Sequence, residues 1–376
     1  MKKIEFFRHC ISDMDIEHAS TILRSIFLTT GAEVHEFEQK FAAYTGQART
    51  VGLMSCTAAL HLSLIALNIG SGDEVITTPM SFCATSNAVL HAGATPVFVD
   101  VEEETGNLNA ELVEAAITER TKAIIPVHLY GQMCDMVKLR AIADKYRLHI
   151  IEDAAHAIEA SRAGIKVGQL ADTACFSFYA TKNITSGEGG AVTTGSHRLA
   201  DTLLMLRQHG IDRGAADRYT RRYEHWDMPL LGWKYNMDNI QAALLLGQLG
   251  RIDELWQKRD ALWKLYEGAL AGIENVAWMK TLQGVRHARH LFTVLVPSQK
   301  RERLLWALQQ RGIGVAVNYR PIHLLKYYRD NFHFREGDFP VAEEIGSRTI
   351  SLPLYPYLAE EEIAYIVQVL SEELNS

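Results

Sequence analysis

Short apolar runs alternate with amphipathic segments through the first half of the chain. The runs are rich in β-branched residues and nearly uninterrupted by charge, a pattern typical of buried parallel strands. They occupy residues 75–79, 96–101, 123–128, 149–153, 174–178 and 190–194. The segments between them, such as 135–146 and 196–207, have the apolar spacing of helices. This alternation predicts crossover units, a mostly parallel sheet and helices on both of its faces, although an eight-stranded barrel would alternate in the same way.

The pattern changes near residue 236. Two stretches with helical spacing follow, one rich in Ala and Leu at 236–249 and a more charged one at 251–271. The rest of the chain has an apolar strand and two helix-like segments, at 290–296, 301–311 and 360–373. A chain of 376 residues is also about twice the usual length of one domain. We therefore expect an α/β fold with a large domain at residues 1–245 and a smaller α+β domain at residues 246–376.

The charge of the chain argues against binding to nucleic acid. It carries 38 Lys and Arg residues against 45 Asp and Glu residues, a formal net charge of −7. The basic residues are scattered, and the cluster of Arg218, Arg221 and Arg222 is interrupted by Tyr219 and Thr220. Because nucleic-acid-binding surfaces need a concentrated basic patch, we expect no nucleic-acid partner.

Composition and cysteine usage indicate a globular protein of a reducing compartment. Hydrophobic residues make up 48% of the chain and charged residues 22%. No window approaches the ~18 uncharged apolar residues of a membrane span, and Glu5 and Arg8 interrupt the apolar stretch that a signal peptide would need. The five cysteines have an odd count and no C-x-x-C pair, which fits neither a disulfide framework nor a zinc site. We expect free thiols, no metal, no membrane contact and a cytoplasmic location.

Polar residues that follow strands are the candidates for chemistry, because open parallel sheets bind ligands beyond the carboxyl ends of their strands. One candidate is the turn Ser55-Cys56-Thr57, which leads into a helix-like segment at 58–67. Ser55 or Thr57 can cap that helix, and its free backbone N–H groups can bind an anion. A capped helix without a ligand explains the same residues. The chain has neither Gly-x-Gly-x-x-Gly nor Gly-Lys-Ser/Thr, the usual signatures of dinucleotide and P-loop sites.

An aspartate and a lysine are the other two candidates. Asp153 ends the apolar run at 149–153, and the small Ala154 and Ala155 after it leave room for a flat ligand. A carboxylate there can hold a protonated ring nitrogen, or it can cap a helix. Lys182 has apolar and small neighbours, and desolvation would lower its pKa and free its amine for Schiff-base chemistry. A lysine in a surface loop is the plain alternative. Together, the anion-binding helix start, the carboxylate and the amine are what pyridoxal phosphate requires.

The order of these motifs resembles the DegT/DnrJ/EryC1/StrS family of pyridoxal-phosphate-dependent nucleotide-sugar aminotransferases. The resemblance covers nearly the whole chain, from residues 28–31 to residues 351–354. The matching landmarks between them are 72–77, 120–128, 152–156, 176–178, 181–183, 187–190, 235–236 and 319–323. The resemblance implies the aspartate-aminotransferase fold, fold type I, with a large cofactor-binding domain and a smaller C-terminal domain.

The resemblance also implies a role for each matching residue. Lys182 would form the covalent link to pyridoxal 5′-phosphate and then shuttle a proton, and Asp153 would keep the pyridine nitrogen protonated. His156, where many relatives carry glutamine, would hydrogen-bond the phenolic oxygen of the ring, and Phe82 would stack on the ring face. The phosphate would be held by the Ser177 hydroxyl, the backbone of Thr57 and Ala58 and, from the neighbouring subunit, Asn236.

By this resemblance the protein is a homodimer with shared active sites that catalyses a ping-pong transamination. L-glutamate would give up its amino group and leave as 2-oxoglutarate, with pyridoxamine 5′-phosphate as the intermediate cofactor form. A nucleotide-linked keto-sugar, first of all a 4-keto-6-deoxy hexose, would then accept the amine. His323 is the implied contact to the substrate, although a histidine in a loop of the small domain needs no such role.

Three other functions fit parts of the sequence. Some family members carry histidine in place of the Schiff-base lysine and dehydrate sugars, so the presence of Lys182 favours transamination. A non-catalytic regulatory member would keep the fold without the chemistry, and an intact Lys182 and Asp153 weigh against it. A nucleotide-dependent oxidoreductase would need the glycine fingerprint that the chain lacks.

Overall fold

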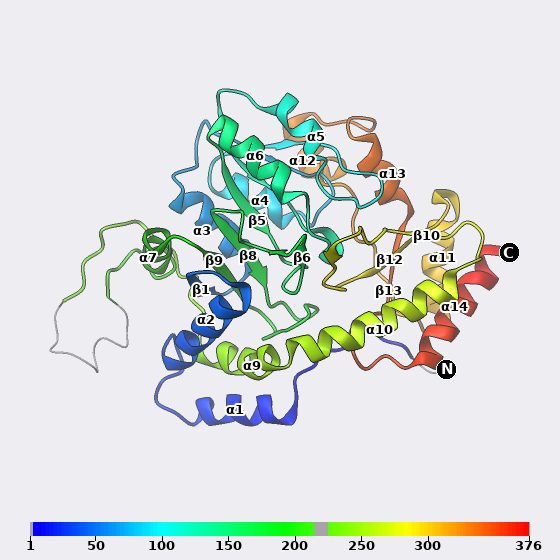
Figure 1. Cartoon of the computed structure of the whole chain (residues 1–376), viewed down its shortest axis with the longest axis horizontal. Helices are drawn as coiled ribbons and strands as arrows, with labels where there is room; N and C mark the ends of the chain where they lie inside the picture. The colour runs from blue at the N-terminus through cyan, green and yellow to red at the C-terminus, as the bar shows by residue number, and fades with distance from the viewer. Residues whose placement is uncertain (1–2, 214–224, 376) are drawn as a thin grey trace.

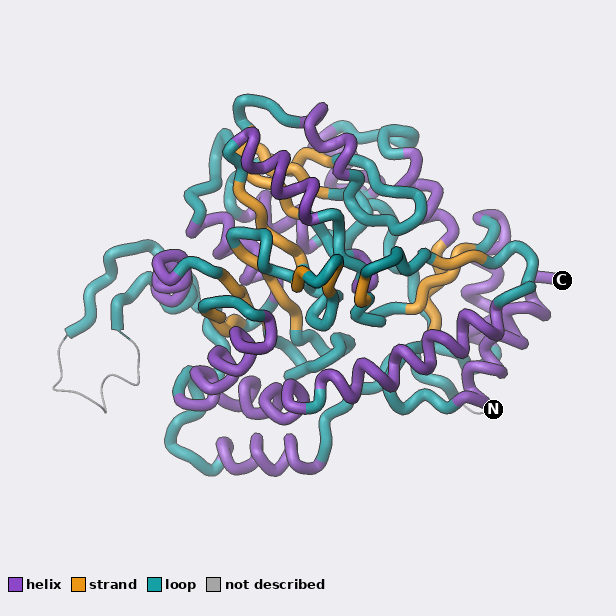
Figure 2. Tube along the Cα trace, in the orientation of Figure 1, coloured by secondary structure: helices purple, strands orange, loops and turns teal. Residues whose placement is uncertain are grey.

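The computed structural model describes residues 3–213 and 225–375 and is organised around one seven-stranded sheet (Figure 1, Figure 2). In spatial order its strands are β1 (Arg49–Leu53), β9 (Gly190–Thr194), β8 (Thr173–Ser177), β5 (His149–Asp153), β4 (Thr121–Ile125), β2 (Glu74–Thr77) and β3 (Thr95–Phe98). The pairs from β8 to β3 are parallel, whereas β9 is antiparallel to both β8 and β1. The sheet is open, because it ends at β1 and β3, and the barrel is therefore excluded.

Helices and two small sheets complete the chain. The helices of the N-terminal part are α1 (Asp13–Leu23), α2 (Ala32–Thr45), α3 (Cys56–Ala66), α4 (Ala84–His91), α5 (Ala110–Val113), α6 (Met136–Tyr146) and α7 (His197–Leu206). Those of the C-terminal part are α9 (Asn239–Gly250), α10 (Ile252–Leu270), α11 (Ser298–Gln310), α12 (Lys326–Phe332), α13 (Pro340–Arg348) and α14 (Glu360–Asn375). One small sheet contains β11 (Val285–Arg286), β6 (Ser161–Arg162) and β7 (Ile165–Lys166), and the other contains β10 (Ala277–Trp278), β12 (Phe292–Leu295) and β13 (Thr349–Leu352).

Both faces of the large sheet are covered by helices, because successive side chains of each strand enter opposite apolar layers. Ile124 and Ile150 belong to the layer that contains residues of α2, α6 and α9. The next residues along the same strands, Ile125 and Ile151, belong to the layer that contains residues of α3, α4 and α7. This arrangement confirms the predicted α/β fold with its mostly parallel sheet.

The C-terminal part forms a second hydrophobic core. The antiparallel sheet β10-β12-β13 packs with α10, α11 and α14, and Phe292, Ile350 and Ile366 are fully buried there. Ile4 lies in the same core and forms a bridge with Ile313, so the first described residues belong to this part. In Figure 1, α10 runs from beside α9 to the C-terminal part. The packing partners change between α9 and α10, whereas the division expected at residue 245 cuts through the middle of α9.

The predicted strands and helices occupy the expected positions, with informative differences. β9 is antiparallel instead of continuing the parallel series, and β1 beside it was not predicted. α9 begins at Asn239, three residues later than expected, because Asp238 caps it. The Asp238 carboxylate accepts a hydrogen bond from Gln241 N at 2.8 Å, and the Gln241 side chain accepts one from Asp238 N at 3.2 Å. Asn236 is therefore in an extended connection that bridges to Leu53 of β1.

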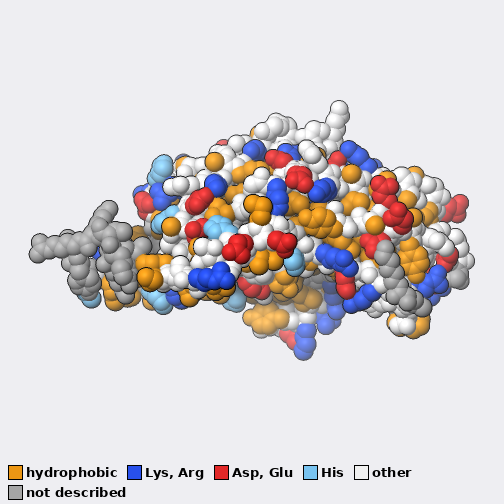
Figure 3. Space-filling view, turned by 90° about the horizontal axis from the view of Figure 1, so that it is seen from below, with side chains coloured by type: hydrophobic (Ala, Val, Ile, Leu, Met, Phe, Trp, Pro, Cys, Tyr) orange, Lys and Arg blue, Asp and Glu red, His pale blue; other side chains and the backbone are white. Residues whose placement is uncertain are grey.

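The surface mixes charged and apolar side chains, as Figure 3 shows for the face seen from below. Among the described residues, no helix combines the length and the apolar character needed to cross a membrane. The same residues contain no cluster of three His, Cys, Asp or Glu side chains suited to a metal ion. All five cysteines are free thiols, and four of them are buried, with Cys83 half-buried. The basic cluster of Arg218, Arg221 and Arg222 lies outside the described residues.

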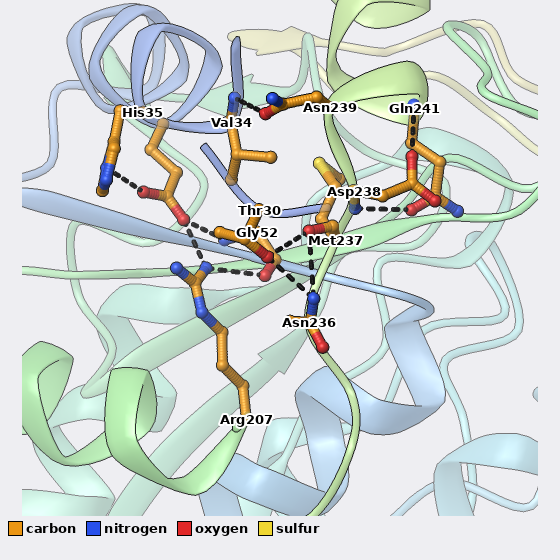
Figure 4. Close-up of polar contacts among 11 residues, drawn as sticks. Thr30, Val34, His35, Gly52, Arg207, Asn236, Met237, Asp238, Asn239 and Gln241 are labelled. Carbon is orange, nitrogen blue, oxygen red and sulfur yellow. Dashed lines mark hydrogen bonds and ion pairs between the residues drawn. The ribbon is translucent and has the colours of Figure 1, made fainter. Parts of the chain in front are cut away.

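A buried ion pair joins α2, α7 and β1. Glu38 is 7% exposed and accepts hydrogen bonds from Arg207 Nη1 and, at 2.8 Å, from Gly52 N. Arg207 also donates to Gly52 O at 2.8 Å (Figure 4). Burial alone raises the pKa of Glu38, but Arg207, His35 and Gly52 outweigh it and hold that pKa below its usual value. The carboxylate is therefore charged in the folded protein and depends on Arg207.

Removing Arg207 is expected to destabilise the protein strongly. Arg207→Met leaves the buried carboxylate with His35, 3.4 Å away, as its remaining ionic partner. Loss of the arginine from this buried pair costs about 3–5 kcal/mol of unfolding free energy. Arg49→Met is the matched control, because Arg49 of β1 pairs with Asp201 at 3.6 Å on the surface and contributes at most about 1 kcal/mol. Urea unfolding followed by circular dichroism measures both variants. Equal losses for the two substitutions would contradict the importance of the buried pair.

Candidate active site

One cavity of about 510 Å³ lies at the carboxyl ends of β5 and β8. This is the edge of a parallel sheet at which ligands bind, and the volume is typical of a site for a small molecule. Six of the residues predicted from the sequence line the cavity: Thr57, Phe82, Asp153, His156, Ser177 and Lys182. The fold thus brings together residues that are far apart in the chain.

The N-terminus of α3 forms one wall of the cavity. Ser55 caps this helix, because its Oγ accepts a hydrogen bond from Ala58 N at 3.1 Å. Gly190 passes so close that a Cβ atom there would lie 2.3 Å from the carbonyl carbon of Ser55, so only glycine fits. The Ser177 Oγ accepts from Tyr179 N at 3.3 Å and keeps its own proton for donation. Backbone N–H groups and a hydroxyl donor at a helix start suit a phosphate group.

Asp153 forms the most deeply buried acidic group of the cavity. It is 5% exposed, its Oδ2 accepts from Thr85 Oγ1 at 2.7 Å, and its Oδ1 accepts from Ala155 N at 3.1 Å. Burial raises the pKa of Asp153, and these hydrogen bonds and the charge of Lys182 offset only part of the effect. Within the described part of the chain, Asp153 has no salt bridge. A buried carboxylate of this kind is suited to a cationic ligand group, such as a protonated ring nitrogen.

Lys182 is the amine of the cavity. Desolvation lowers the pKa of Lys182 to about 8, and the opposing effects of Cys56 and Asp153 are smaller. The next residue, Asn183, anchors the turn by donating to Glu159 Oε2 at 2.8 Å and to Ala288 O at 3.0 Å. At physiological pH a larger fraction of Lys182 is therefore in the neutral amine form than is the case for an ordinary lysine.

His156 is held as a neutral ring in one tautomer. Burial, and then the charge of Lys182, lower the pKa of His156 well below its usual value. Its Nδ1 accepts a hydrogen bond from Tyr130 N at 3.3 Å, so the single ring proton lies on Nε2. Nε2 lies 3.1 Å from the hydroxyl of Tyr319, to which it donates. The Tyr319 hydroxyl therefore keeps its own proton for another acceptor.

An exposed aromatic side chain completes the cavity. Phe82 is 58% exposed although it is large and apolar, and its ring centroid lies 6.1 Å from that of Tyr319. A flat ligand on Phe82 would cover this apolar surface. The stacking role expected from the sequence stays a prediction.

Three predicted residues do not line the cavity. The Ala58 N–H is used by the Ser55 cap. Asn236 faces Thr30, to whose Oγ1 it donates at 2.7 Å (Figure 4), and its expected role concerns a neighbouring subunit. His323 is fully buried in the C-terminal part, 2.9 Å from Glu343 Oε1 and against the ring of Phe339. The packing and the carboxylate partner account for this histidine without a substrate.

Thr85 and Tyr319 also line the cavity, and neither was given a role from the sequence. Thr85 lies one helical turn after Phe82, and its hydroxyl donates to Asp153. Tyr319 comes from the C-terminal part and bonds to His156. Thr85 could have been suspected from its spacing to Phe82, whereas the position of Tyr319 depends on how the two parts of the chain pack.

The residues present fit pyridoxal phosphate. A helix start with a hydroxyl donor suits its phosphate, the uncompensated carboxylate of Asp153 suits its protonated ring nitrogen, and the desolvated amine of Lys182 suits its aldehyde. Phe82 offers the ring a face, and His156 lines the same cavity with its N–H bonded to Tyr319. All of these groups border one cavity.

Comparisons with known proteins identify relatives over nearly the whole chain. The model of the DegT/DnrJ/EryC1/StrS aminotransferase family matches residues 9–371. The spore coat polysaccharide biosynthesis protein SpsC of Bacillus subtilis is 39% identical to the chain over 368 residues, which cover 96% of this chain and 95% of SpsC. A structure from Streptococcus pneumoniae described as a sugar aminotransferase in its PMP form has a TM-score of 0.93 at 33% identity and covers 99% of each chain. DesV of S. venezuelae in complex with a ketimine intermediate has a TM-score of 0.88 at 37% identity, covering 96% of this chain and 94% of DesV.

The amine of Lys182 is expected to react with electrophiles at lower pH than an exposed lysine. Its pKa of about 8 means that the reactive neutral form grows in as the pH rises through 8. Lys280 is the control, because it is exposed and its pKa is raised by Glu104. Competitive acetylation of the cofactor-free protein at different pH values, read by peptide mass spectrometry, measures both midpoints. Coinciding midpoints would show that the cavity does not desolvate Lys182.

Proposed function

Because the chain belongs to the DegT/DnrJ/EryC1/StrS aminotransferase family, we propose that it transfers an amino group from L-glutamate to a nucleotide-linked keto-sugar. A 4-keto-6-deoxy hexose is the first candidate for the acceptor. The observation that carries the proposal is the pair formed by Lys182 and Asp153, which border one cavity without an ion pair between them in the described residues. Sugar aminotransferases among the similar structures support it.

Each cavity residue has a task in this reaction. Bound pyridoxal phosphate supplies an aldehyde that condenses with amines and a ring that accepts electrons from the reacting carbon. Asp153 holds the ring nitrogen protonated, and Thr85 and Ala155 N–H fix the carboxylate that does so. The start of α3 and Ser177 hold the phosphate, which orients the ring against Phe82.

Lys182 moves the proton. Its Nζ would bind the cofactor between reactions and, once released, would move a proton between the substrate carbon and the cofactor carbon in each half-reaction. A pKa of about 8 is near the operating pH, which suits a group that must both accept and donate. We propose that the Tyr319 hydroxyl, which is bonded to His156 Nε2, donates its proton to an oxygen of the substrate.

The site is proposed to be shared between two subunits of a homodimer. Large apolar side chains are strongly exposed, with Ile26 at 92% and Leu231 at 77%. Both are near the Asn236 segment along the chain: Asn239 N donates to Leu28 O, close after Ile26 in sequence, and Leu231 shortly precedes Asn236. Exposed apolar groups of this kind suit an interaction surface. A second copy bound here would bring its Asn236 segment toward the phosphate end of the cavity.

The cytoplasm is the proposed location. The five cysteines are all unpaired thiols, which persist in a reducing compartment.

Half-reactions test the function. The purified protein with pyridoxal phosphate is expected to be yellow, to lose the yellow band with L-glutamate and to regain it with a keto-sugar nucleotide. Lys182→Ala is expected to lower turnover by about 10²–10⁴-fold, the contribution of a group that moves a proton, while still binding pyridoxamine phosphate. Lys280→Ala, at an exposed lysine outside the cavity, is expected to leave turnover unchanged.

Nitrogen transfer separates the proposal from its alternatives. ¹⁵N-labelled glutamate is expected to yield ¹⁵N-labelled amino-sugar nucleotide. Consumption of the keto-sugar without gain of nitrogen would make the protein a dehydratase. A protein that takes up no pyridoxal phosphate would be a binding or regulatory member of the family.

The shared site makes activity depend on assembly. Ile26→Asp is expected to shift the protein toward a monomer, because it places a charge in the proposed apolar interface, and to lower activity in parallel. Ile16→Asp, on the 55% exposed Ile16 of α1, is a comparison variant that tests how far the interface extends. Sedimentation velocity at several concentrations measures the assembly. Full activity of a monomeric Ile26→Asp protein would refute the shared site.

A further inference from the structure

Three buried side chains form a chain of hydrogen bonds that ends at the carboxylate of Asp153. Thr85 is the second residue of α4, and Ser81 precedes it by four positions. Both line the active cavity, although Ser81 is only 4% exposed and Thr85 only 1%. The Ser81 Oγ lies 2.8 Å from Thr85 Oγ1, which in turn lies 2.7 Å from Asp153 Oδ2. Two hydroxyl groups therefore connect in series to the carboxylate.

The direction of these hydrogen bonds follows from the protons that are present. Thr85 has one hydroxyl proton and two acceptors within reach, Asp153 Oδ2 at 2.7 Å and Phe82 O at 3.2 Å. The shorter bond, to a charged oxygen, is the stronger one, so the Thr85 hydroxyl donates to Asp153. Toward Ser81, Thr85 Oγ1 can then only accept. The chain thus runs from Ser81 through Thr85 to Asp153.

Backbone contacts hold the two hydroxyl groups in place. Thr85 N donates to Phe82 O at 3.2 Å in the turn that leads into α4. Ile322 N of the C-terminal part donates to Pro79 O at 2.8 Å, two residues before Ser81. The chain is therefore preorganised before any ligand enters the cavity. Hydrogen bonds in series polarise one another, so each hydroxyl strengthens the next donor.

A proton shared between Asp153 and a ring nitrogen can rest on either of the two atoms. Burial raises the pKa of Asp153 and so favours the neutral acid, which would leave the ring nitrogen without its proton. Among the groups that oppose this effect, the hydroxyl of Thr85 contributes most. The hydrogen-bond chain therefore acts on the group whose protonation state decides the charge of a bound ring.

We propose that Ser81 and Thr85 determine on which side of the hydrogen bond between Asp153 and the ring nitrogen the proton lies. Thr85 stabilises the carboxylate directly. Ser81 is a positioning residue that acts through Thr85, because its hydrogen bond makes the Thr85 hydroxyl a stronger donor. With the carboxylate stabilised, the proton stays on the ring nitrogen, where it favours the acceptance of electrons by the ring. This inference rests on the proposed function.

Three variants and a matched control test the parts of the chain. Thr85→Val removes the hydroxyl but keeps the shape of the side chain, Thr85→Ser restores the hydroxyl, and Ser81→Ala removes the first donor. Ser86→Ala is the control, because Ser86 is the next residue of α4, is fully buried and does not line the cavity. Unfolding temperatures confirm that each variant is folded.

The position of the proton is read from pyridoxal phosphate labelled with ¹⁵N in its ring, because NMR distinguishes a protonated from a neutral ring nitrogen. The unmodified protein, Thr85→Ser and Ser86→Ala are expected to show the protonated nitrogen. Thr85→Val is expected to shift the equilibrium toward the neutral nitrogen by about 10- to 100-fold, as the loss of a hydrogen bond to a charged group does. Ser81→Ala is expected to give a smaller shift in the same direction.

The cofactor-free protein gives a second readout that does not depend on the proposed function. Infrared spectroscopy with ¹³C-labelled aspartate follows the titration of the carboxyl groups, and Asp153→Asn identifies the band of Asp153. Thr85→Val is expected to raise the pH midpoint of this band by about 1–2, which corresponds to the same 10- to 100-fold change. The other groups that face Asp153 are the same in all variants: Lys182, His128, Cys56, Cys175 and Tyr319.

A ring nitrogen that stays protonated in Thr85→Val would overturn the proposal, and one that is unaffected in Ser81→Ala would overturn the role of Ser81. Equal shifts in Ser86→Ala would also overturn it, because they would show a general structural effect. A raised midpoint of Asp153 in the Thr85→Val form of a protein that takes up no pyridoxal phosphate would support control of the Asp153 proton by Thr85 while refuting the proposed function.

Discussion

The burial of two opposite charges in one cavity without an ion pair between them is the constraint on which the site depends. Burial raises the pKa of Asp153 and lowers that of Lys182, so each is pushed toward its neutral form. A direct pair would relieve both groups and leave neither free to bind a ligand. The fold keeps them apart at the carboxyl ends of β5 and β8, where a bound ring can satisfy one group and its aldehyde the other.

The rest of the structure holds this arrangement in place. Helices cover both faces of the sheet and keep its strands buried. The side chains at the strand ends therefore extend from a rigid sheet. Gly190 lets β9 approach the start of α3 closely, which sets the position of the anion-binding N–H groups. Asn183 ties the segment of Lys182 to Glu159 and Ala288, and through Glu159 to Arg259 of the helix that joins the two parts. The amine is thus positioned from both parts of the chain.

Most of the fold could be predicted from the sequence, because continuous apolar runs specify buried strands whatever their neighbours are. The direction of β9 could not, since it depends on the connection and not on composition. Asp153 and Lys182 were recognisable because each sits at a strand end or beside glycines, where a site is expected. Tyr319 was not, because packing between distant segments brings it to the cavity. Histidine is common in active sites, but His323 is buried outside the cavity, where it bonds to Glu343 and packs against Phe339.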